Sequence, residues 1–183
     1  MHPLFAYSHQ VHHAPILYDV RRTLSAQTVM DSTTRSPVPA HTLTQPATDP
    51  PTTAPDHLLL KSHKFPWMIV VKASSPSHSE ETERSNQHSS VTANVITNWD
   101  VLCAVYTTLV ARVTPDEYEA LGNESQAQRR VSRAYERRCS VMGSQKKGIR
   151  RVDWLGGKTH LIGIKVDRSS GGRIGKLVFA RIP

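Results

Sequence analysis

The sequence contains only two cysteines, Cys103 and Cys139, and this scarcity excludes two ways of holding a small protein together. They are 36 positions apart, with no CxxC motif and no cysteine or histidine at the spacing of zinc ligands. Neither a disulfide framework nor a zinc site is therefore indicated. Arginines next to Cys139 would stabilise a thiolate, but no histidine lies near it in the sequence. We expect both residues to be buried, reduced thiols.

Long hydrophobic runs are missing as well. Hydrophobic residues make up 38% of the chain, and nowhere do 18 apolar residues follow one another, as a membrane-spanning helix would require. The N-terminal residues contain no uninterrupted apolar stretch preceded by lysine or arginine, so no secretory signal is expected. These absences predict an intracellular protein, cytoplasmic or nuclear, that does not use a membrane as a partner.

Motifs for catalysis or cofactor binding are also lacking. The letters GGKT at 156–159 match the end of a phosphate-binding P-loop, but Val152 occupies the position where that loop needs its first glycine. No GxSxG motif is present, so a serine hydrolase is not indicated. His9, His12 and His13 cluster without an acidic residue at a spacing that would complete a metal site. The sequence thus offers no catalytic residue, no metal ligand and no cofactor, and an unrecognised enzyme is the least favoured function.

Positive charge is concentrated in residues 129–151. This stretch contains nine lysines and arginines and a single acid, Glu136, so its net charge of +8 equals that of the whole chain. On a helix over 128–142, Val131, Ala134 and Tyr135 share an apolar stripe, while most of the arginines fall on the other side. The candidate contacts for an anion or a partner protein are Arg129, Arg130, Arg133, Arg137, Lys146 and Lys147.

Two functions fit this basic face. A protein-interaction or scaffold module would engage an acidic partner with it, whereas a nucleic-acid-binding protein would place Arg129, Arg133 and Arg137 on phosphates. Aromatic residues make up only 6% of the chain, and none interleaves the arginines as single-strand binders require. Trp154 is accordingly interpreted as a core anchor. The sequence favours the non-enzymatic interaction module and keeps nucleic acid as an alternative partner, with the oligomeric state open.

One arginine of the basic helix does not follow the pattern. Arg138 falls between Ala134 and Met142 on the apolar stripe. An isolated buried guanidinium would be too costly, so we expect a carboxylate partner. Asp153 is the first candidate because it precedes Trp154 in a segment expected to pack on the helix, and the next candidates are Glu117 and Glu119. An Arg138–Asp153 ion pair would have a structural role.

Hydrophobic patterning predicts an α+β domain with a small, mostly antiparallel sheet and about three helices packed on one face. Runs of β-forming residues predict strands over 16–20, 58–60, 67–72, 91–96, 151–155, 159–166 and 174–181. The last three are expected to form a meander with glycine turns at 156–157 and 171–172. Capping boxes of Thr97 with Asp100 and of Thr114 with Glu117 predict two helices before the basic one.

Two stretches have too little hydrophobic mass to offset the entropy of ordering them. Residues 25–56 are rich in threonine, serine and alanine and include six prolines, and residues 74–90 are rich in serine, glutamate and histidine. We expect a single domain over residues 1–183 with flexible insertions at 25–56 and 74–90, and a best-ordered core over 97–166.

Several of these segments together resemble a known family. WDVLCAVYTTL at 99–109, VTPDEYEAL at 113–121, RRVSRAYERRC at 129–139 and RRVDWLGGKTHLIGI at 150–164 are similar to a domain-of-unknown-function family abundant in mushroom-forming fungi. HPLFAYS at 2–8 and the PxxxDV pattern at 15–20 extend the resemblance, which covers residues 1–164 and is interrupted by the two polar insertions. It implies a compact α+β domain and brings no catalytic residue, ligand or activity with it.

Overall fold

The computed structural model describes residues 1–74, 94–142, 148–167 and 174–181. Its centre is a sheet of six strands in the order β2-β1-β5-β6-β3-β4. Neighbouring strands are antiparallel except β3 and β6, which are parallel, so the sheet is mixed and mostly antiparallel. The strands are β1 (Ile16–Asp19), β2 (Val29–Asp31), β3 (Leu58–Ser62), β4 (Phe65–Val71), β5 (His160–Val166) and β6 (Ile174–Ala180).

The α+β prediction is confirmed, and the structure also bears out the antiparallel pairing of β5 with β6. The helices are α1 (Ala40–Leu43), α2 (Asn98–Val110), α3 (Pro115–Glu119) and α4 (Gln126–Met142), with a 3-10 helix, η2 (Arg151–Leu155). Both predicted capping boxes are present. Thr97 opens α2 and Thr114 opens α3, each side chain accepting a hydrogen bond from the backbone N–H three residues later.

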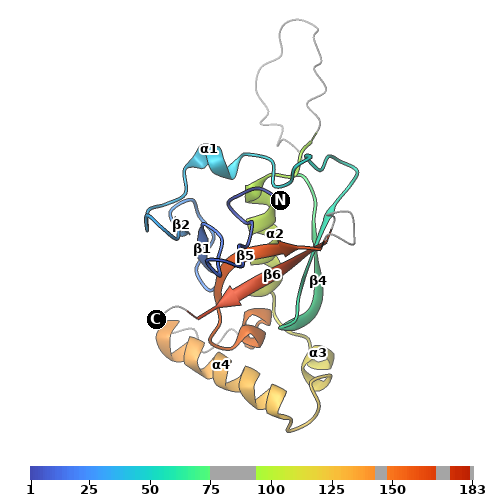
Figure 1. Ribbon diagram of the computed structural model, residues 1–183. Coiled ribbons are helices and arrows are strands. Elements are labelled where there is room, and N and C mark those ends of the chain that lie inside the picture. The colour runs from blue at the N-terminus through green and yellow to red at the C-terminus, as the bar shows by residue number, and fades with distance from the viewer. Residues whose placement is uncertain (75–93, 143–147, 168–173, 182–183) are drawn as a thin grey trace, which may run out of the picture.

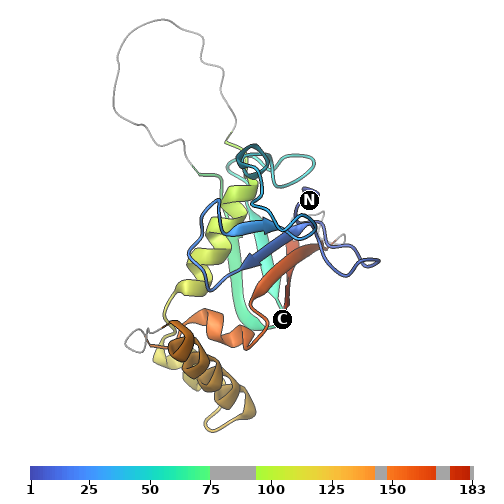
Figure 2. The ribbon, with the colours of Figure 1, turned by 90° about the vertical axis from the view of Figure 1, so that its left-hand side faces the viewer.

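The helices do not share one face of the sheet, as the sequence had led us to expect. Only α2 lies along the sheet, where it contacts β4, while α1 lies at one end of the molecule and α3 and α4 at the other (Figures 1 and 2). Helix α4 packs on η2 rather than on a strand. Because α4 has few neighbours, a long side of it faces solvent.

Residues 25–56 are not the structureless insertion that their composition predicted. They contain β2, which extends the sheet, and α1, which contacts α2. Val29, Val38, Leu43 and Ala47 are all buried in the core. Four apolar side chains thus anchor this segment in the core, although its overall composition is polar and predicted disorder. The other proposed insertion, 74–90, lies almost wholly outside the described residues.

Two further strand predictions were wrong. Residues 151–155 form η2, because Val152, Asp153, Trp154 and Leu155 are buried in succession, and an alternating strand cannot bury successive side chains on one face. In the segment 91–96 the described part contributes an isolated bridge from Val95 instead of a strand. The first glycine turn therefore joins η2 to β5, and the second, at 171–172, lies outside the described residues.

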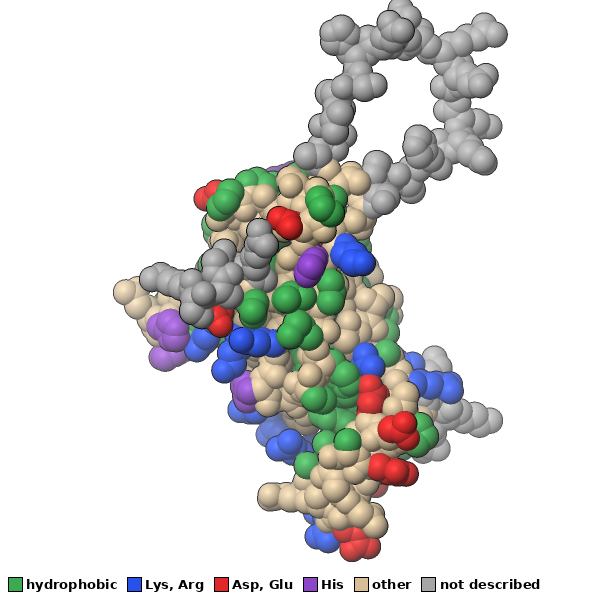
Figure 3. All heavy atoms as spheres, turned by 90° about the vertical axis from the view of Figure 1, so that its right-hand side faces the viewer, with side chains coloured by type: hydrophobic (Ala, Val, Ile, Leu, Met, Phe, Trp, Pro, Cys, Tyr) green, Lys and Arg blue, Asp and Glu red, His purple; other side chains and the backbone are tan. Residues whose placement is uncertain are grey.

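The sheet has an exposed edge at β4. The side chains of Phe65, Ile69 and Val71 are buried, whereas Met68 and Val70 on the opposite face are 53% and 47% exposed. Figure 3 shows hydrophobic side chains grouped on this face of the molecule, with acidic side chains towards its lower end. Among the described residues no helix is long and apolar enough to cross a membrane.

Candidate anion-binding site

Helix α4 separates its side chains as the periodicity predicted. Val131, Ala134, Arg138 and Cys139 are buried. The exposed side carries Arg129, Arg130, Arg133 and Arg137, four of the six predicted contacts. The remaining two, Lys146 and Lys147, lie outside the described residues. A shallow hollow along this exposed side is lined by the four arginines together with Glu124, Gln126 and Glu136.

The ion pair expected between Arg138 and Asp153 is present in the structure. Nε of Arg138 donates to Oδ1 of Asp153 and Nη2 donates to Oδ2, both at 2.9 Å, and the two side chains are only 5% and 2% exposed. Nη2 also donates to the carbonyl of Gly148, and Oδ2 accepts the backbone N–H of Arg150. The hydrogen bonds with Asp153 raise the pKa of Arg138 above its ordinary value. Both carboxylate oxygens are thus engaged, and the pair joins α4 to η2.

The alternative partner Glu117 has a different role. Its Oε1 accepts hydrogen bonds from Nε1 of Trp67 at 2.7 Å and from Nη2 of Arg151 at 2.6 Å. The Arg151 guanidinium lies 4.7 Å from the centre of the Trp67 ring, and that ring makes an edge contact with Trp154. Trp154 is buried, as expected of a core anchor. This cluster fastens α3 and η2 to the edge strand β4.

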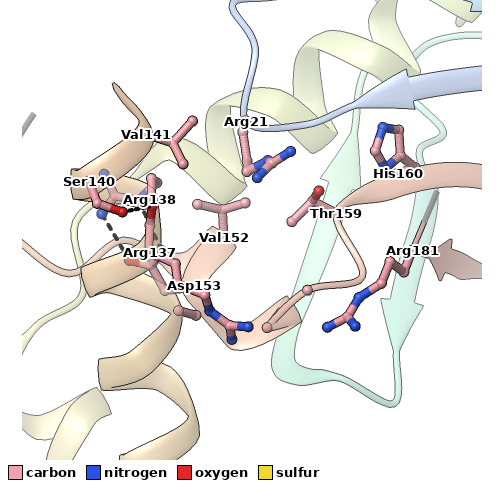
Figure 4. Close-up of a pocket in the computed structure, with 13 residues that line it drawn as sticks. Arg21, Arg137, Arg138, Ser140, Val141, Val152, Asp153, Thr159, His160 and Arg181 are labelled. Carbon is pink, nitrogen blue, oxygen red and sulfur yellow. Dashed lines mark hydrogen bonds and ion pairs between the residues drawn. The ribbon is translucent and has the colours of Figure 1, made fainter. Parts of the chain in front are cut away.

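A second hollow lies where the end of α4 meets the body of the protein. Its volume is about 430 Å³, and its lining comes from α4, η2, the Gly156–Gly157 connection, the start of β5 and the residues just after β1 and β6. Figure 4 shows the side chains of Arg21, Arg137 and Arg181 reaching it from three separate segments. The remaining residues of the lining are Ala134, Arg138, Ser140, Val141, Val152, Asp153, Gly156, Gly157, Thr159 and His160. We call this hollow the arginine pocket.

The three arginines differ in how much of their charge is already paired. Arg21 binds Asp19 with both Nε and Nη2, the shortest contact being 2.7 Å. Arg137 uses Nε on the carbonyl of Arg133 at 3.2 Å. Within the described part of the chain, neither Arg137 nor Arg181 takes part in an ion pair. The pocket therefore offers two unpaired guanidinium groups and a third that a carboxylate holds in place.

The histidine of the pocket adds little positive charge. Burial lowers the pKa of His160, Asp19 opposes this effect from 3.9 Å, and the neighbouring arginines lower the pKa further. The imidazole is therefore neutral at pH 7. The only carboxylate in the lining, that of Asp153, is neutralised by Arg138. The net charge that a ligand meets comes from the arginines.

This arrangement suits binding better than bond-breaking chemistry. The pocket lines up no nucleophile with an activating base: Ser140 donates to the Arg137 carbonyl, and Thr159 is buried. Nowhere in the described residues do three or more His, Cys, Asp or Glu side chains group closely enough to hold a metal ion. Several guanidinium groups lining one hollow are suited to carboxylate or phosphate ligands.

Sequence reasoning found one of the three pocket arginines, Arg137, and missed the other two. Arg21 lies two residues after the end of β1 and Arg181 directly follows β6, and each looks in the sequence like an ordinary charged residue near a strand end. The order of the sheet brings them together, because β5 lies between β1 and β6. No local motif signals that neighbourhood.

Comparison with known proteins gives a family without a function. No curated protein and no solved structure matches the chain significantly. A family model described as a family of unknown function, DUF6699, matches residues 16–172. The match runs from β1 past the end of β5, so it includes α4, η2 and most of the arginine pocket, and it leaves out the HPLFAYS motif and β6. Since the match spans most of the sequence, the chain belongs to the DUF6699 family.

Proposed function

We propose that the protein is an interaction module that binds an acidic partner protein through the exposed side of α4. The observation that carries this proposal is that the exposed arginines of α4 form no ion pairs within the described part of the protein. Arg129, Arg130 and Arg133 project from a helix whose main packing partner is η2, and none of them forms an ion pair with another described residue. Unpaired like charges on one face contribute nothing to folding, so a partner of opposite charge explains them.

The mixture of charges on this side favours protein over nucleic acid. Glu124 and Glu136 line the same hollow as the arginines. A phosphate backbone is uniformly negative and would be repelled by these acids, whereas a protein surface can present complementary charges of both signs. The hollow also lacks an aromatic side chain on which a base could stack.

The test compares two triple variants with the same loss of charge. Arg129, Arg130 and Arg133 are replaced together by Gln in the first, and the exposed residues Arg22, Lys72 and Lys176 are replaced by Gln in the second. Each tagged protein is used to capture partners from lysate with and without nuclease treatment. We expect a specific acidic protein to be captured by the wild type and the second variant and lost with the first.

Two results would overturn this proposal. Equal loss with both variants would show that total charge, and not the α4 face, controls binding. Capture that disappears on nuclease treatment would assign the face to nucleic acid. In that case, replacing Arg129, Arg133 and Arg137 by Gln should reduce the slope of log affinity against log salt by about three.

A further inference from the structure

We propose that the arginine pocket binds a phosphate monoester carried by a side chain of the protein partner, that is, a phosphorylated residue. The inference rests on the proposed function, because the pocket continues the basic side of α4 through Arg137, which lines both hollows. It adds the chemical identity of one group on the partner. It also assigns a role to Arg21 and Arg181, which lie outside α4.

The arrangement of the guanidinium groups supports a compact, multiply charged anion. Arg137 comes from α4, Arg181 from the residue after β6 and Arg21 from the turn after β1. In Figure 4 the side chains of Arg137 and Arg181 extend towards each other across the hollow, and Arg21 lies on the other side of Val152 and Thr159. A phosphate monoester carries a charge near −2 at neutral pH and accepts hydrogen bonds on three oxygens, which matches several donors better than a carboxylate does. Arg21 is already oriented by its hydrogen bonds to Asp19, so ordering it for binding costs little entropy.

The guanidinium of Arg181 lies close to the backbone at Gly157. A Cβ atom added to Gly157 would clash with Nη2 of Arg181 and would stand 2.9 Å from its Nε. Only a residue without a side chain therefore lets this guanidinium rest where it does. The Arg181 side chain is exposed, and the lack of a side chain at Gly157 leaves room for its guanidinium beside the pocket.

The size and the apolar wall of the pocket indicate more than a free ion. A volume of about 430 Å³ falls in the range of small-ligand sites and exceeds what one phosphate group needs. Ala134, Val141 and Val152 form a hydrophobic part of the lining, and Val141 is 77% exposed. These side chains can contact the carbon atoms that carry the phosphate. A phosphorylated side chain supplies both parts, the charged group and the apolar stem.

The same lining argues against a nucleotide or a nucleic acid strand as the ligand. It contains no phenylalanine, tyrosine or tryptophan, so a base would find no ring on which to stack apart from the half-buried imidazole of His160. A strand would also require a continuous basic track. The second hollow, through which such a track would run, includes Glu124 and Glu136.

The experiment is an NMR titration of the full chain, observing arginine Nε–Hε signals at constant ionic strength. The probes are N-acetyl-O-phosphoserine amide, its unphosphorylated form, inorganic phosphate and a short single-stranded DNA. We expect the phosphoserine probe to shift the signals of Arg137 and Arg181 saturably, and the unphosphorylated form to shift neither. Arg137→Gln and Arg181→Gln should each weaken the phosphoserine affinity about tenfold, since each removes a charge-assisted hydrogen bond.

The matched control is Arg130→Gln, which removes the same charge from a residue outside the pocket lining. It should leave the phosphoserine affinity unchanged, and Arg181→Lys should weaken it less than Arg181→Gln because the charge is kept and only the planar fork is lost. Thermal melts of each variant show that the fold is intact.

Three outcomes would overturn the inference. Equal weakening by Arg130→Gln would reduce it to general charge attraction. Inorganic phosphate binding as tightly as the phosphoserine probe would make the pocket a site for the free ion. DNA shifting Arg129, Arg130 and Arg133 more strongly than the phosphoserine probe shifts Arg137 and Arg181 would assign the surface to nucleic acid. If the pocket fails while partner capture still depends on Arg129, Arg130 and Arg133, the proposed function stands without this addition.

Discussion

The buried ion pair between Arg138 and Asp153 provides the sharpest test of how α4 is held on the body. We consider three variants: Arg138→Met, Asp153→Ala and the double replacement. Methionine fills much of the space of the arginine stem without its charge, and alanine removes the carboxylate entirely. Each single variant leaves one charged group in a site where the original side chains are 5% and 2% exposed.

The expected magnitudes follow from what each change leaves unpaired. Removing either partner of a buried ion pair typically costs about 3 kcal/mol, because the remaining charge has lost its partner and cannot reach water. Asp153→Ala also removes the acceptor for the Arg150 N–H, at roughly 1 kcal/mol. The double variant leaves neither charge behind, so we expect it to cost clearly less than the sum of the single variants, with a coupling of about 2 kcal/mol.

The assay is urea unfolding followed by far-UV circular dichroism, which gives the free energy of unfolding and the m value of each variant. An unchanged m value shows that the same cooperative unit unfolds in all of them. Arg137→Met is the control, since it changes the adjacent, exposed arginine and should alter stability by less than about 0.5 kcal/mol. Additive effects in the cycle, or a neutral Arg138→Met, would refute the reasoning that this pair fastens α4.

Two other predictions concern stability. Burial acts to raise the pKa of Glu117, but hydrogen bonds from Arg151, Thr114 and Trp67 outweigh it and lower that pKa below its ordinary 4.5. Its contribution to stability is therefore complete above about pH 4.5 and is lost as the pH falls through the lowered value, so Glu117→Gln should flatten the acid limb of a stability-against-pH curve; an unchanged limb would contradict this. Gly163 has φ +144°, and an added Cβ would lie 3.0 Å from that of Ala14 and 3.2 Å from the Phe5 carbonyl oxygen. Gly163→Ala should lower the free energy of unfolding by roughly 1–3 kcal/mol, and an unchanged urea midpoint would show that the strands adjust freely.

Local chemistry made the helices predictable. Thr97 with Asp100 and Thr114 with Glu117 are reciprocal capping pairs that act within one turn, so neither depends on the rest of the fold. Arg138 could be singled out for a related reason, since a charge on an apolar stripe needs a partner wherever the helix packs. Such inferences succeed because the information lies within a few residues.

The features that could not be predicted depend on contacts between distant parts of the chain. The parallel pairing of β3 with β6 joins Leu60 to Gly175, and no sequence pattern in either strand specifies it. Residues 25–56 were misjudged because a few anchors such as Val29 and Leu43 are diluted by polar neighbours. The arginine pocket was missed for the same physical reason, since Arg21 and Arg181 become neighbours only after the sheet has formed.

The Arg138–Asp153 ion pair and the two proposed binding surfaces are linked by helix geometry. Successive residues on an α-helix are rotated by about 100°, so fixing Arg138 on Asp153 sets the direction of every other side chain on α4. With Arg138 turned towards η2, Arg133 and Arg137, which are four residues apart on one face of the helix, both lie on the exposed side, and Arg137 also reaches the arginine pocket. The pocket also takes part of its lining from η2 through Val152, so it exists only while α4 and η2 remain together. Removing the Arg138–Asp153 ion pair should therefore weaken phosphoserine binding even where the protein stays folded, although the charges of these two residues neutralise each other and do not bind the ligand.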